Sequence, residues 1–99
     1  MREVIVSKLA FSKLSQIADY IAAKFSSKDK DNFLDKFEKV ILLIQQNPEL
    51  FPKSELNKTR HKCVLSKYTT IHYQYNSKTV RIVAVFDTRQ NPNKINKTK

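Results

Sequence analysis

Seven side chains in the second half of this sequence have types that bind anions or move protons. They are Arg60, His61, Lys62, Tyr68, His72, Arg81 and Arg89. Arginine presents a planar fork of donors to phosphate or carboxylate groups. Histidine is the side chain whose ordinary pKa lies close to neutrality. The set therefore predicts an anion-binding surface, with general acid–base chemistry as a further option.

Arg60, His61 and Lys62 are consecutive and precede a short strand candidate. One interpretation is a solvated junction between loop and strand, because surface charges often do nothing more. The other is a clamp for a phosphate or carboxylate group. The sequence leaves both open.

Arg81 interrupts an apolar run from Thr79 to Phe86, and Arg89 follows that run. A buried unpaired charge is costly, so the face that carries Arg81 must be open or supply a carboxylate, for which Asp87 is a candidate. Arg89 lies where loops collect binding groups, and Asp87 or Thr88 could orient it. We rank Arg89 first among the candidate functional residues.

His72 alternates with Ile71 and Tyr73, so it should lie on the polar face of its strand. A general acid or base in RNA cleavage is one role for it, and we favour a plain surface histidine. Tyr73 and Tyr75 share the face of Ile71 and should be core residues. Tyr68 is a candidate for stacking on bases.

Composition excludes several classes of protein. The 99 residues include no glycine, which removes Gly-rich phosphate loops, so we expect no nucleotide cofactor. Two histidines and one cysteine, without clustered carboxylates, predict no metal site. Cys63 cannot form an internal disulfide, and no apolar run approaches a membrane span, which together favour the cytoplasm.

Positive charge is concentrated in one half of the chain. Residues 1–52 carry 8 Lys/Arg and 7 Asp/Glu, whereas residues 53–99 carry 11 and 2. The net charge of the second half is therefore +9 of the total +10. Such a field favours an anionic partner, either nucleic acid or an acidic protein segment.

Periodicity predicts a single α+β domain over residues 1–99. A strand at 2–6 precedes two helices with apolar stripes at helical spacing, with Ser7 and Ser26 or Ser27 at their starts. Asn47-Pro48 ends the second helix. Strand candidates follow at 62–65, 70–75 and 79–86, and residues from Pro92 form a basic tail. The expected order is β-α-α-β-β-β, with an antiparallel helical hairpin packed on a small, twisted, mainly antiparallel sheet.

Several segments in this order resemble the RelE/ParE family of toxins. They are Leu9-Ala10, Ile17-x-x-Tyr20-Ile21, Asn47-Pro48-Glu49-Leu50-Phe51-Pro52, Lys67-Tyr68 through Ile71-His72-Tyr73, and Val85-Phe86-Asp87-Thr88-Arg89-Gln90-Asn91-Pro92. The resemblance covers about residues 2 to 93. It implies a growth-inhibiting bacterial toxin of a type II toxin–antitoxin module, held inactive by a cognate antitoxin.

The resemblance also implies two targets. RelE-like members cut messenger RNA on the ribosome with an Arg on the third strand, an Arg after the last strand and a Tyr near the end. Arg89 matches the second of these. The third-strand position is Thr70, with His72 two residues on, and no tyrosine follows Tyr75. Cleavage would therefore need a relocated site that uses His61, His72 or Arg81.

ParE-like members inhibit DNA gyrase and do not need that set, so we favour this branch. Arg60, Arg81 and Arg89 would then be target contacts, with His61, Lys62 and Tyr68 beside them. The alternatives are the ribosome-dependent nuclease, with His72, Arg81 and Arg89 as catalytic residues, and an inactive or general basic nucleic-acid-binding domain.

Overall fold

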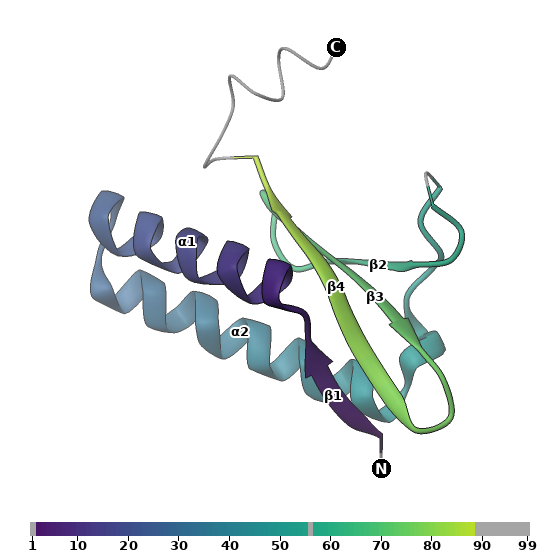
Figure 1. Cartoon of the computed structure of the whole chain (residues 1–99). Helices are drawn as coiled ribbons and strands as arrows, with labels where there is room; N and C mark the ends of the chain where they lie inside the picture. The colour runs from purple at the N-terminus through teal and green to yellow at the C-terminus, as the bar shows by residue number, and fades with distance from the viewer. Residues whose placement is uncertain (1, 56, 89–99) are drawn as a thin grey trace.

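A computed structural model of the chain describes residues 2–55 and 57–88, and Figure 1 shows its two layers. A helical hairpin forms one layer and a four-stranded sheet forms the other. The elements follow in the order β1 (Glu3–Val6), α1 (Lys8–Lys24), α2 (Ser27–Gln46), the short 3-10 helix η1 (Pro48–Leu50), β2 (His61–Val64), β3 (Thr69–Tyr75) and β4 (Thr79–Asp87). The predicted β-α-α-β-β-β fold is confirmed.

Each long helix begins at a serine cap. The Ser7 side chain accepts a hydrogen bond from the Ala10 N–H at 3.1 Å, and the Ser26 side chain accepts one from the Asp29 N–H at 3.0 Å. Serine at this position satisfies a backbone donor that the helix itself leaves unpaired. The second helix ends at Asn47, because Pro48 cannot continue it. The predicted caps and helix ends are confirmed.

The sheet has the strand order β1-β4-β3-β2. Strand β1 runs parallel to β4, whereas β4, β3 and β2 are antiparallel neighbours. A β-bulge lies between two registered pairs, His72 with Ala84 and Tyr73 with Ile82. Val83 is the additional residue on β4. After Val83, the side chains of β4 point to the opposite faces of the sheet from those that regular alternation would give.

The bulge determines which β4 side chains face the helices. Val80, Ile82 and Val85 are buried in the core with Ile17 and Ile21 of α1. Arg81 and Phe86 are exposed on the other side of the same strand. The helices therefore cover one face of the sheet, and no helix within residues 2–55 and 57–88 covers the opposite face (Figure 1).

Tyr73 fastens the segment after α2 to this core. Its side chain is fully buried, and its hydroxyl donates a 2.6 Å hydrogen bond to the Pro48 carbonyl. The His61 ring stacks on it at 5.2 Å, and His61 Nδ1 lies 2.8 Å from the Phe51 carbonyl. The connection from α2 to β2 is thus held at two points.

We expect Tyr73→Phe to lower the free energy of unfolding by about 1–2 kcal/mol, because a buried carbonyl would lose its partner. Chemical denaturation of the two proteins measures the difference. Tyr20→Phe, at a half-buried position on α1, is the matched control and should change stability by less than about 0.5 kcal/mol. Equal stability of Tyr73→Phe and the wild type would contradict this role for the hydroxyl.

Candidate functional site

The uncovered side of the sheet, called here the open face, brings together most of the predicted functional residues. It comprises Arg60, Lys62, Val64, Thr70, His72, Gln74, Arg81, Ala84 and Phe86, with Ile5 at its β1 side. The assignment follows from strand register, because residues that pair on adjacent strands share a face.

The open face consists of three rows that cross the strands. Lys62, His72 and Ala84 form the middle row. Val64, Thr70 and Phe86 form the row at one end. Gln74, Arg81 and Ile5 form the row at the other end.

Arg60 extends this last row. It lies one residue before His61, which pairs with Tyr73 on the antiparallel strand β3, and Gln74 lies one residue after Tyr73. A 3.2 Å hydrogen bond from Gln74 Nε2 to Thr59 Oγ1 holds the loop before β2 close to β3. Cations therefore occupy two adjacent rows, and the third row is largely apolar.

The three cations of the open face are available for a ligand. Arg81 and Lys62 are exposed and Arg60 is half-buried. Within the described residues, none of the three forms a salt bridge. An anion that binds here would not have to displace a carboxylate of the described residues.

His72 lies buried beneath these cations. Its side chain is only 9% exposed, and the Phe86 ring packs edge-on against it at 5.1 Å. Its Nδ1 atom is buried without a hydrogen-bond partner in the described structure. Burial lowers the pKa of His72 below its ordinary value, and the charges of Arg60 and Lys62 lower it further. The ring is therefore neutral at pH 7.

Two expectations about this surface need correction. We expected a surface histidine at position 72, but Phe86 and the neighbouring rows cover it. Asp87 is not the partner of Arg81, because it is buried and accepts a 2.5 Å hydrogen bond from Thr69 Oγ1. Thr69 and Asp87 are paired on the opposite face of the sheet. Of the two environments expected for Arg81, an exposed face or a carboxylate partner, the structure shows the exposed face.

The other predicted residues lie apart from this cluster. His61 faces the core, where it contacts Tyr73 and Tyr75. Tyr68 is 39% exposed in the loop before β3, and the Lys67 ammonium lies 5.6 Å from its ring centre. Arg89, our first choice from the sequence, lies outside the described residues, so its role stays a prediction.

Cys63 is buried in β2, as expected, and burial raises the pKa of its thiol to about 11. A reactive thiolate is thereby disfavoured at neutral pH.

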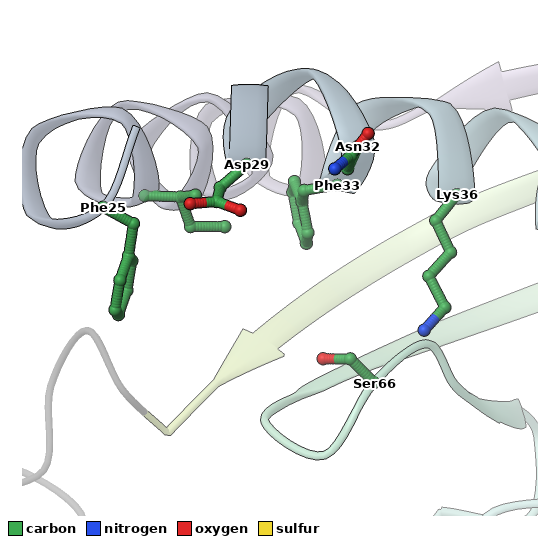
Figure 2. Close-up of a pocket in the computed structure, with 7 residues that line it drawn as sticks. Phe25, Asp29, Asn32, Phe33, Lys36 and Ser66 are labelled. Atoms are coloured by element: carbon green, nitrogen blue, oxygen red, sulfur yellow. The ribbon is translucent and has the colours of Figure 1, made fainter. Parts of the chain in front are cut away.

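A separate groove lies between the tip of the helical hairpin and the loop that joins β2 to β3 (Figure 2). It encloses about 340 Å³ and is lined by Ile21, Phe25, Asp29, Asn32, Phe33, Lys36 and Ser66. Phe25 is 61% exposed, and Figure 2 shows Lys36 extending toward the Ser66 loop. Of the predicted functional residues that the structure describes, none lines this groove.

Neither long helix, within residues 2–55 and 57–88, is long and apolar enough to cross a membrane. In the same part of the chain, no three His, Cys, Asp or Glu side chains gather as ligands for a metal ion.

A model of the family described as the ParE toxin of the type II toxin–antitoxin system, parDE, matches residues 4–92. The chain belongs to this toxin family. A sequence search of curated proteins found no match. A toxin of this family has a cognate antitoxin as its partner.

Solved structures share the fold at low sequence identity. A chain of the chromosomal ParDE toxin–antitoxin system from P. aeruginosa superposes with a TM-score of 0.75 at 11% identity, covering 88% of this chain and 96% of that one. YafQ from the E. coli DinJ–YafQ complex gives 0.60 at 14% identity, with coverage of 90% and 96%. YoeB from Staphylococcus aureus gives 0.61 at 11%, with 86% and 94%.

Sequence reasoning missed the apolar part of the surface. Phe86 and Val64 are 51% and 62% exposed, and we had not selected either one. Strict alternation from Arg81 would have placed Phe86 in the core, and the bulge at Val83 reverses this. For Val64, alternation with Cys63 was an available signal.

We expect Lys62→Met to raise the pKa of His72, because one of the cations that disfavour its protonation is removed. The pH titration of the imidazole resonances by NMR measures this shift. Lys28→Met, which removes an exposed lysine on α2, is the matched control and should leave the titration unchanged. A lower pKa in Lys62→Met, or an equal shift in the control, would contradict the predicted arrangement.

Proposed function

We propose that this toxin arrests growth by binding DNA gyrase through the open face of its sheet, without cleaving a substrate. The observation that carries the proposal is the composition of that face. Exposed Phe86 and Val64 form the row next to Lys62, and Arg81 lies one row further along the same face. Aromatic residues and arginine are both enriched on protein-binding surfaces.

The state of His72 further supports a binding role over catalysis. A general base must reach the proton that it removes, and the His72 side chain is almost completely buried. The exposed cations can hold an anionic group, but among the described residues the carboxylate on this face, Glu3, lies beyond the Arg81 row and away from His72. The family match supports the same branch. The cytoplasm, where gyrase acts, is the proposed location.

Purified toxin should block the supercoiling of relaxed plasmid by gyrase, and induced expression should cause DNA-damage signalling and filamentation. Arg81→Ala should reduce the inhibitory potency about tenfold, because an exposed interfacial arginine is lost. Lys28→Ala, on the helical layer, is the matched control. Unchanged supercoiling at high toxin concentration would reject the proposal, and a toxin that proved harmless would instead indicate an inactive domain.

A second candidate function, ribosome-dependent cleavage of messenger RNA, is favoured by one observation. A neutral imidazole beneath two cations could accept a proton from a 2′-hydroxyl group once the adjacent phosphate is bound. In that mechanism Arg60 and Lys62 would hold the phosphate, and Phe86 would have to move to expose the ring.

For this alternative, expression should stop translation rapidly and leave breaks at defined codons. His72→Gln should then reduce cleavage by about two to four orders of magnitude, because the proton acceptor is lost. Under the gyrase proposal the same variant should retain inhibition within about threefold. Transcript mapping and supercoiling assays on this one variant therefore separate the two functions.

A further inference from the structure

Hydrogen bonds hold the backbone of Arg60 on both sides. Its carbonyl accepts a 2.8 Å hydrogen bond from the Ser54 N–H, and its own N–H donates to the Asn57 carbonyl at 3.0 Å. Both polar groups of the Arg60 backbone are therefore bonded within the loop that precedes β2. The Lys62 N–H adds a further link, because it donates to the Pro52 carbonyl at 2.8 Å and holds the start of β2 against the same loop.

Side-chain hydrogen bonds tie this loop to β3. Thr59 Oγ1 donates to Asn57 Oδ1 at 2.6 Å and accepts from Gln74 Nε2 at 3.2 Å. Asn57 Oδ1 also accepts the Thr59 N–H at 3.1 Å, and the Asn57 N–H lies 3.4 Å from the hydroxyl oxygen of the buried Ser54. Thr59 thus links Asn57, which bonds the Arg60 backbone, to the neighbouring strand.

We infer that Arg60 is the anchoring cation of the open face, and that Thr59 and Asn57 are the positioning residues that hold its guanidinium next to His72. The inference rests on the proposed function, because it names the cation that contributes most to binding an anionic group of the target. The contact itself belongs to Arg60. Thr59 and Asn57 act through Arg60 and need not touch the target.

The half-buried position of Arg60 favours this role. Lys62 and Arg81 are exposed, and long exposed side chains lose much rotamer freedom when they bind a ligand. Arg60 starts from a bonded backbone and a half-buried side chain, so it has less freedom to lose. Its guanidinium also presents a planar pair of donors to a carboxylate or phosphate group, whereas an ammonium is a point charge.

His72 reports where the Arg60 charge lies. Burial is the largest cause of the lowered pKa of His72, followed by the charge of Arg60 and then by that of Lys62. Lys62 is the direct cross-strand partner of His72, so strand register alone would give Lys62 the larger effect. The Arg60 charge is therefore less screened by water than that of the exposed Lys62 side chain.

The other charged groups near His72 are few in the described residues. Arg81 faces the ring from β4, and the neighbours of His72 on its own strand are uncharged. Glu3 lies beyond the Arg81 row, and Asp87 lies on the core face. A displacement of the Arg60 charge should therefore appear directly in the titration of His72.

The positioning role is tested with purified full-length toxin that carries Thr59→Val, which keeps the shape of the side chain and removes both bonds of its hydroxyl. The variant should raise the pKa of His72 in an NMR titration of the imidazole resonances, because the Arg60 charge is no longer held in place. It should also reduce the inhibition of gyrase supercoiling about fivefold. Asn57→Ala, which removes the acceptor of the same hydroxyl, should change both readouts in the same direction.

Two control variants separate positioning from general stability. Thr59→Ser restores the hydroxyl and should restore both readouts. Thr79→Val is the matched control, because the Thr79 hydroxyl also donates to an asparagine, Asn76 Oδ1 at 3.2 Å, but in the turn between β3 and β4. It should leave the titration of His72 and the inhibition of supercoiling unchanged.

The anchoring role is tested on Arg60 itself. Arg60→Ala should reduce the inhibition of supercoiling about thirtyfold, a larger loss than that expected for Arg81→Ala. Arg60→Lys keeps the charge without the planar fork and should recover only part of this loss. Arg60→Met should raise the pKa of His72 more than Lys62→Met does.

An unchanged titration of His72 in both Thr59→Val and Asn57→Ala would overturn the positioning role, even if these variants unfolded more easily. Inhibition by Arg60→Ala that equals the inhibition by the wild type would overturn the anchoring role. A wild-type toxin that leaves supercoiling unchanged would reject the proposed function and the anchoring role with it. The titration needs no gyrase, so it would still decide whether Thr59 and Asn57 position Arg60.

Discussion

The β-bulge at Val83 determines which side chains of the central strand face the helices and which face solvent. Before the bulge, Val80 and Ile82 are buried and Arg81 is exposed; after it, Val85 is buried and Phe86 is exposed. A regular strand with Val80 and Ile82 in the core would also bury Ala84 and Phe86, leaving Val85 outside. Ser7 supports the bulge from the start of α1, since its N–H donates to the Ile82 carbonyl at 3.0 Å and its hydroxyl lies 3.3 Å from the Val83 carbonyl. Ser7 therefore both caps α1 and contacts the backbone of β4 at the bulge.

Local signals in the sequence were sufficient for the elements and their order. Ser7 and Ser26 cap helices because a hydroxyl oxygen can accept a bond from an unpaired N–H, which depends on a few neighbouring residues. Pro48 ends α2 for an equally local reason. The outward direction of Arg81 followed from the cost of burying a charge beside Val80 and Ile82. Each of these predictions required only the chemistry of a short segment, and each is confirmed by the structure.

Features that depend on distant segments could not be predicted in the same way. The burial of His72 requires Phe86, fourteen positions away, to reach the same face, and this depends on the bulge in the β3–β4 register. Adjacent residues of a strand point to opposite faces, so the sequence already implied that His61 and Lys62 lie on opposite faces. The sequence did not show which residues His61 contacts. Its ring lies between Tyr73 and the Phe51 carbonyl because the loop after η1 folds back onto β2. Charge in the sequence thus indicated a cationic surface, whereas strand register decided which charges belong to it.

The position of His72 has a physical consequence for the charge of the open face. A fourth permanent cation beside Arg60, Lys62 and Arg81 would strengthen anion binding but would also increase repulsion within the free protein. His72 adds no such charge, because burial and the charges of Arg60 and Lys62 lower its pKa. A neutral imidazole therefore keeps the repulsion among the described cations of this face lower than a fourth permanent cation would.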